Sequence, residues 1–139
     1  MSDLPLSGLR VLLLEDEVLI ALDVEQLCRD AGAAHVGIVH SPAQMQDGGI
    51  ALTDYDAAIL DVMLQGQSTA EQARALAAAG TPFVFATGYV DGHEIFDEFP
   101  DITVVGKPYV GTELIEAVAR CFSRRSRSSD GSSEEVAAD

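Results

Sequence analysis

The sequence predicts one three-layer α/β domain built on a five-stranded parallel sheet. Two observations lead to this prediction: five short apolar runs recur along the chain, and segments with helical periodicity or helix-boundary signals separate them. Strands that alternate with helices in this way need crossover connections, which are right-handed and bring the strands together in parallel. A chain of 139 residues is long enough to bury one hydrophobic core, and no internal repeat is visible.

The predicted strands are continuous apolar runs, which is typical of strands buried on both faces of a sheet. They cover residues 11–14, 36–39, 57–60, 83–86 and 102–105. The first helix, between the first two runs, has an apolar stripe and stops at Gly32, a residue type favoured just past a helix end. The second begins at Ser41-Pro42, an N-cap followed by the residue best tolerated at the first helical position.

The remaining helices are identified by their end signals. Ser68 and Glu71 have the spacing of a capping box, so the third helix is expected to begin there and to end at Gly80. Residues 91–100 include glycine and proline, which leave room for a short helix at most. The last helix is predicted from Thr112 to Phe122.

The domain is expected to occupy residues 8–122, after a short N-terminal extension over residues 1–7. Residues 123–139 are rich in serine and in charges of both signs, so burial would not offset the entropy of ordering them. We therefore predict a disordered tail there. Cys28 and Cys121 lie in apolar helical patterns and are expected to be buried, reduced thiols, as in a cytoplasmic protein.

The charge of the chain is strongly negative. Eight Lys and Arg residues stand against 23 Asp and Glu residues, for a net charge of −15. Such a surface repels phosphate backbones, so we expect no direct binding of nucleic acid, whereas an acidic pocket with a divalent metal ion fits. No apolar run approaches the roughly 20 residues of a membrane-spanning helix, and the N-terminus does not resemble a secretory signal, so no membrane association is expected.

Four of the five predicted strands are followed by a chemically distinctive polar group. Glu15-Asp16 follows the first strand, Asp61 the third, Thr87 the fourth and Lys107 the fifth. Because the carboxyl ends of parallel strands meet at one edge of the sheet, where ligands bind in such folds, we expect these groups to converge. Three carboxylates together suit Mg²⁺, and Asp61 has the chemistry of a nucleophile toward a phosphoryl group. Lys107 and Thr87 could then stabilise the transferring oxygens.

These residues carry a resemblance to a known family. The run LLLEDE at 12–17, the apolar run into Asp61, Thr87 and the pair Lys107-Pro108 resemble the receiver domains of bacterial two-component response regulators over residues 8–122. The resemblance implies a doubly wound, flavodoxin- or CheY-like sheet in the order 2-1-3-4-5, with Asp61 as the phosphoacceptor. It implies a Mg²⁺ site formed by Glu15, Asp16, Asp61 and the backbone carbonyl of Met63, and contacts from Thr87 and Lys107 to the phosphoryl group.

The chain departs from the common receiver pattern at several positions. Glu15 replaces the aspartate found in many receivers, and Val104 stands where an aromatic switch residue is common. The segment PFVFATGY at 82–89 resembles the signature of the FAT GUY receivers, which implies HWE-type histidine kinases as partners and a switch at Thr87, Gly88 and Tyr89. Glu17 is expected to start a helix rather than to bind metal. Residues 88–100 are expected to be mobile before phosphorylation and partly ordered by it.

The expected function is that of a stand-alone, non-enzymatic receiver that takes a phosphoryl group from a histidine kinase or phosphotransfer protein. Its output would be altered contact with a downstream protein partner. Two alternatives remain at this point. A haloacid-dehalogenase-type phosphatase would need a second acid two residues after Asp61, where Met63 stands. A receiver-like binding module that works without phosphorylation is favoured by Glu15 and Val104, but the presence of Asp61, Thr87 and Lys107 together argues against it.

Overall fold

The central sheet has the predicted order. The structure is a computed structural model that describes residues 4–46, 50–88, 94–107 and 111–138, without the side chains of Gln46, Glu94 and the residues after Arg124. Within these residues, five strands pair in parallel. Their spatial order is β2-β1-β3-β6-β7, which is the order 2-1-3-4-5 once the two short strands β4 and β5 are set aside. The five strands are β1 (Arg10–Leu14), β2 (His35–Val39), β3 (Ala57–Asp61), β6 (Phe83–Thr87) and β7 (Val104–Gly106).

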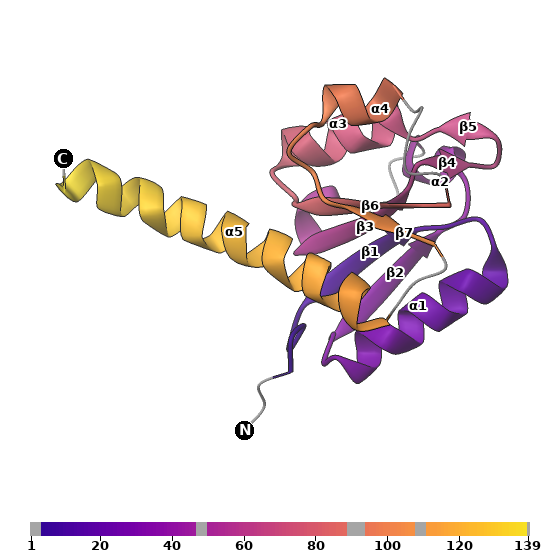
Figure 1. Cartoon of the computed structure of the whole chain (residues 1–139), viewed down its shortest axis with the longest axis horizontal. Helices are drawn as coiled ribbons and strands as arrows, with labels where there is room; N and C mark the ends of the chain where they lie inside the picture. Colours follow the sequence, from indigo (N-terminus) through magenta and orange to yellow (C-terminus); the bar gives the residue numbers. More distant parts are fainter. Residues whose placement is uncertain (1–3, 47–49, 89–93, 108–110, 139) are drawn as a thin grey trace.

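Helices cover both faces of this sheet, as Figure 1 shows, and complete the three layers. Helix α1 (Val18–Asp30) and the first turns of α5 (Gly111–Ala138) bury apolar side chains against one face. Helices α2 (Pro42–Gln46), α3 (Ala70–Ala79) and α4 (Glu94–Glu98) lie on the other, above the second core cluster. A 3₁₀ turn, η1 (Leu52–Asp54), precedes β3.

Most predicted helix boundaries agree with the structure. Helix α1 ends two residues before Gly32, α2 begins at Pro42, and Gly80 follows α3 in the left-handed conformation, with φ of 76°. In the segment 91–100, predicted to hold a short helix at most, the described residues form one helix, α4, of five residues. Residues 89–93 lie outside the described part of the chain, so the predicted mobility of residues 88–100 stays a prediction.

The start of the third helix was predicted wrongly. Ser68 is not the N-cap residue of α3, because it is the last residue of a short hairpin that was not predicted, formed by β4 (Met63–Leu64) and β5 (Gln67–Ser68). Thr69 takes the N-cap position instead. The turn of the hairpin places both Gln65 and Gly66 at positive φ, 53° and 78°. A two-residue turn of this kind is usually signalled by Asn-Gly or Asp-Gly, and Gln-Gly is a weaker signal.

The carboxyl terminus also differs from prediction. Residues 123–139 were expected to be a disordered tail, whereas α5 continues as a helix to Ala138. Extending an existing helix avoids the unfavourable nucleation step, and the alanine, arginine and glutamate residues here favour helix. Figure 1 shows the last turns running away from the sheet. The last residue of α5 that packs on the described core is Phe122, which coincides with the predicted end of the domain.

Both cysteines are free and buried, as predicted. Burial raises the pKa of the Cys28 thiol to about 12 and that of Cys121 to about 11, so neither is a reactive thiolate at neutral pH. Within the described residues, no helix has both the length and the apolar character needed to cross a membrane.

Candidate functional site

The predicted site residues converge at the carboxyl edge of the sheet. Lys107, just after β7, places its Nζ 2.9 Å from Oε1 of Glu15 and 2.8 Å from Oδ2 of Asp61. Carboxylate oxygens of Glu15, Asp16 and Asp61 all lie within 4.8 Å of one another. Residues that are 46 to 92 positions apart in sequence are thus joined by one ammonium group. The register explains this, because neighbouring parallel strands end side by side.

Glu15 is a buried carboxylate with defined partners. Its side chain is 1% exposed, and besides Lys107 it accepts a hydrogen bond from the backbone N–H of Glu17 at 3.2 Å. Burial raises the pKa of Glu15, while the hydrogen bond from Lys107 opposes that rise. Glu17 itself is the N-cap residue of α1, as expected. The longer side chain of Glu15 is therefore accommodated inside the domain by an ion pair.

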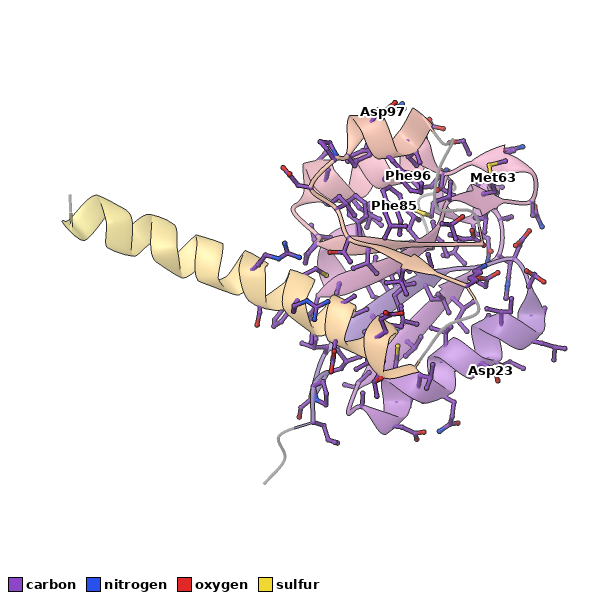
Figure 2. All side chains as sticks on the ribbon, viewed as in Figure 1. Asp23, Met63, Phe85, Phe96 and Asp97 are labelled. Atoms are coloured by element: carbon purple, nitrogen blue, oxygen red, sulfur yellow. The ribbon has the colours of Figure 1, made fainter. Side chains whose placement is uncertain are left out.

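Asp61 ends β3 and is almost as enclosed, with a side chain 13% exposed. Its Oδ2 accepts from Lys107, and its Oδ1 accepts from the backbone N–H of Met63 at 3.4 Å. Met63, predicted to offer its carbonyl to a metal ion, begins β4, and its side chain is exposed on the hairpin (Figure 2). The carboxylate of Asp61 is held by one charged group and one backbone group of its own loop.

Asp16 is tied to the same loop. Its Oδ2 accepts a hydrogen bond of 2.9 Å from the backbone N–H of Gln65, the first residue of the hairpin turn. This hydrogen bond joins the turn of the hairpin directly to the acidic cluster. Neither Gln65 nor the hairpin was identified from the sequence as part of the site, because a backbone N–H donor carries no sequence signal.

Thr87 is placed beside the acids by the register of β6. Asp61 pairs with Ala86, so Thr87 stands one residue further along the neighbouring strand, where its side chain is buried. Its carbonyl accepts a hydrogen bond of 2.8 Å from the backbone N–H of Lys107. Gly88 is exposed next to it. Tyr89, the third predicted switch residue, lies outside the described residues.

The donor set fits a hard divalent cation such as Mg²⁺. Three carboxyl groups and the amino group of Lys107 meet in a largely enclosed space. Oxygen ligands of this kind are those that Mg²⁺ prefers. Glu15, Asp16 and Asp61 are the residues that would hold it. Among the described residues, this is the one group of acidic, histidine or cysteine side chains close enough to share a metal ion.

The described histidines, His35 and His40, are not part of this cluster. His40 lies nearest, with Nδ1 3.1 Å from the backbone oxygen of Glu15. His35 packs against the ring of Tyr55 on the edge strand.

The fold and the site define a class of protein. A parallel sheet in this order, with helices on both faces, is the CheY-like, flavodoxin-type fold, and the solved structures that match it include receiver domains of response regulators. This agreement supports a response regulator role for the chain. No protein-family model matches the sequence, and no curated protein matches it.

Three solved structures illustrate the likeness. A response regulator receiver protein from Sinorhizobium medicae is 27% identical, covers 85% of this chain and 97% of its own, and superposes with a TM-score of 0.71. The signal receiver domain of a modulated diguanylate cyclase from Desulfovibrio desulfuricans is 23% identical, with coverage of 86% and 98% and a TM-score of 0.74. A CheY-like receiver domain protein from Methanospirillum hungatei is 19% identical, with coverage of 88% and 99% and a TM-score of 0.72.

Proposed function

We propose that this protein accepts a phosphoryl group on Asp61, in a Mg²⁺-dependent reaction, from a histidine kinase or a phosphotransfer protein. The observation that carries the proposal is the Lys107 ammonium, held between Asp61 and Glu15 inside a group of three carboxylates. A lone structural ion pair needs one acid, whereas this arrangement combines a nucleophile, a cation that can meet the transferred oxygens and a set of metal ligands.

The chemistry follows from the residues. A carboxylate oxygen of Asp61 attacks the phosphorus of a phosphohistidine; the new P–O bond forms as the P–N bond breaks, and the electron pair leaves with the imidazole. Lys107, 2.8 Å from Asp61, is close enough to contact an oxygen of the attached group. The buried hydroxyl of Thr87 comes from the adjacent strand. Mg²⁺, when bound, supplies further positive charge for the equatorial oxygens.

A protein rather than a nucleic acid is the proposed partner. Val18, Leu19 and Leu22 expose 59%, 78% and 53% of their surface at the start of α1, directly after the acid pair. Apolar side chains grouped at one end of a helix beside a reactive site suit burial by a protein surface. The net charge of −15 disfavours a phosphate backbone. We propose this face as the docking surface for the phosphodonor protein.

Finer assignments rest on the sequence motif. The segment PFVFATGY supports placement among the FAT GUY receivers, with an HWE-type kinase as donor and a signal passed through Thr87, Gly88 and Tyr89 to a downstream partner. We further propose that the protein works in the cytoplasm, where its buried thiols stay reduced, and that it acts without enzymatic turnover of its own.

The test is incubation with a small phosphodonor and Mg²⁺ followed by intact mass measurement. The wild type should gain one phosphoryl group that is labile to alkali and to hydroxylamine, as an acyl phosphate is, and Asp61→Asn none, whereas Asp23→Asn, which changes an exposed acid of α1, should behave as wild type (Figure 2). Chelation of Mg²⁺ should abolish labelling. Equal labelling of wild type and Asp61→Asn would refute the phosphoacceptor assignment, and no labelling of either would favour a binding module.

A further inference from the structure

Hydrogen bonds hold the loop between Asp61 and Thr69 in place at its tip and at its base. Figure 1 shows the β4–β5 hairpin that it forms at the carboxyl edge of the sheet. At its tip, the backbone N–H of Gln65 donates to Asp16. At its base, the side chain of Thr69 turns back toward β3. Two of the three predicted acidic metal ligands, Asp16 and Asp61, are therefore joined by one short segment of backbone.

Thr69 is fully buried, and its hydroxyl is used in an unusual way. Oγ1 lies 2.7 Å from the carbonyl oxygen of Asp61 and 3.0 Å from that of Val62, so its single proton is shared by two backbone acceptors. The Thr69 backbone N–H adds a second bond to the Val62 carbonyl, at 2.9 Å. A threonine at an N-cap usually accepts from the first turn of its helix. Thr69 makes no such bond, and the Ser68 hydroxyl accepts from the N–H of Ala70 instead.

We propose that Thr69 is a positioning residue for the acidic site. Its hydroxyl fixes the two peptide units that follow the Asp61 side chain, and so sets the direction of the Asp61 carboxylate and of the Met63 backbone. This inference rests on the proposed function, because the acids it positions are those of the proposed phosphoryl and metal site. Thr69 touches no reacting atom, so it acts only through Asp61, Val62 and Met63.

The physical reason lies in the geometry that a cation demands. Mg²⁺ tolerates little departure from octahedral coordination, so ligands whose positions are not fixed bind it more weakly. Groups that orient a metal ligand through hydrogen bonds typically change metal affinity by about tenfold to a hundredfold when removed. Valine has nearly the shape of threonine but no hydroxyl donor, so Thr69→Val removes the side-chain hydrogen bonds to the carbonyls of Asp61 and Val62 without leaving a cavity, while the backbone N–H of residue 69 still donates to Val62. Serine keeps the donor.

The chain offers a matched control in Thr81. It flanks the other end of α3, is equally buried, and donates through Oγ1 to the backbone oxygen of Leu52 at 3.0 Å. It lies after Gly80, at the amino end of β6 and therefore at the sheet edge opposite the acids. Thr69→Val and Thr81→Val remove the same chemical interaction, and only one of them lies at the candidate site.

The experiment compares wild type, Thr69→Val, Thr69→Ser and Thr81→Val in three measurements. Thermal melting reports overall stability, amide hydrogen exchange over residues 61–69 without metal reports local opening, and titration with Mg²⁺ or Mn²⁺ reports cation affinity. We expect both valine variants to melt lower. Only Thr69→Val should exchange about fivefold to tenfold faster over 61–69 and bind the cation about tenfold more weakly, with Thr69→Ser close to wild type.

The outcomes separate this inference from the proposed function. If wild type binds no divalent cation and accepts no phosphoryl group, the proposed function fails, while hydrogen exchange in the metal-free protein still tests the positioning of the loop. If wild type binds the cation and Thr69→Val binds it equally well, Thr69 is not a positioning residue. Equal weakening by Thr81→Val would likewise overturn the inference, because the effect would then follow general stability.

Discussion

At the scale of single residues, the central feature is the burial of charge around Lys107. The Lys107 ammonium lies within 3 Å of the carboxylates of Glu15 and Asp61, and the side chains of Glu15, Asp61 and Lys107 are 1%, 13% and 15% exposed. Removing one partner from a buried ion pair leaves a charge without compensation, which destabilises far more than the loss of an exposed pair. The pair formed by Arg74 and Glu98 is a natural comparison, because both of its side chains are well exposed.

Lys107→Ala should therefore lower the free energy of unfolding by about 2 kcal/mol, because Glu15 and Asp61 lose their shared cation. Arg74→Ala should change it little, because solvent screens the pair it breaks. Urea unfolding of wild type and both variants in metal-free buffer measures the two effects. Similar values for the two variants would show that Lys107 is not an important internal counterion.

The pH dependence of stability should carry a signature of Glu15. Its pKa is raised in the folded state above the ordinary value of 4.5, chiefly by burial. The folded protein therefore holds the Glu15 proton more tightly than the unfolded chain, and the stability from this group is present below pH 4.5 and lost as the pH rises through the raised pKa. Glu15→Gln, which cannot titrate, should lack this decline. Urea unfolding without metal from pH 4 to pH 8 compares the two proteins, and parallel profiles would contradict the prediction.

At the scale of elements, α4 shows how a helix of five residues is kept in place. Phe96 and Phe99 meet Phe85 of β6 with ring centroids 5.8 and 6.0 Å apart and interplanar angles of 64° and 65°. Figure 2 shows Phe96 directed from α4 toward Phe85, with Asp97 on the outer side. Edge-to-face pairs of this kind add about 0.5–1.5 kcal/mol beyond the area they bury. Aromatic packing thus anchors α4 to the strand that carries Thr87.

Phe96→Ala should loosen α4 and lower the free energy of unfolding by about 2 kcal/mol, because it removes a partly buried ring and its contact with Phe85. Asp97→Ala changes the next residue of the same helix, whose side chain is exposed, and should leave stability within about 0.5 kcal/mol of wild type. Urea unfolding and hydrogen exchange over residues 94–99 measure both. If both variants left exchange over α4 unchanged, the aromatic contacts would not hold the helix.

The elements also show what could be predicted from sequence. The five strands were recognisable because buried parallel strands are continuous apolar runs, and their order came from the family resemblance. The acidic site followed, because residues after parallel strands meet at one edge. The β4–β5 hairpin and the role of Thr69 were missed, since they depend on backbone donors, on a turn with Gln65 in the left-handed conformation and on a threonine that bonds backward. No local pattern encodes these three features.

At the scale of the whole molecule, the basic residues are unevenly distributed along the chain, and the last helix extends beyond the sheet. Residues 1–119 carry only four of the eight basic residues, and the other four lie in α5 from Arg120 onward. Helix α5 joins the core through Leu114, Val118 and Phe122 and then continues beyond the sheet. Its two halves therefore have different surroundings.

Truncation after Arg124 should leave the free energy of unfolding within about 0.5 kcal/mol of the full chain, because the last α5 residue packed on the described core is Phe122 and Arg124 keeps its hydrogen bond to Thr103. Truncation after Val118 should destabilise strongly, since it deletes the buried Cys121 and the partly buried Phe122. Urea unfolding of the two shortened proteins tests this contrast. A large loss in the longer truncation would place part of the core beyond residue 124.

The position of Lys107 has a consequence for how strongly the site would bind a divalent ion. Its ammonium group binds the oxygens of Glu15 and Asp61 that a divalent ion would also bind, so it is an internal competitor for the proposed metal site. A competitor that is covalently tethered is present at a constant, high effective concentration, which lowers the apparent affinity for the ion without changing the ligands. Under the proposed function, the concentration of free divalent ion would then be a second input to the protein, and its capacity to accept a phosphoryl group would rise and fall with that concentration.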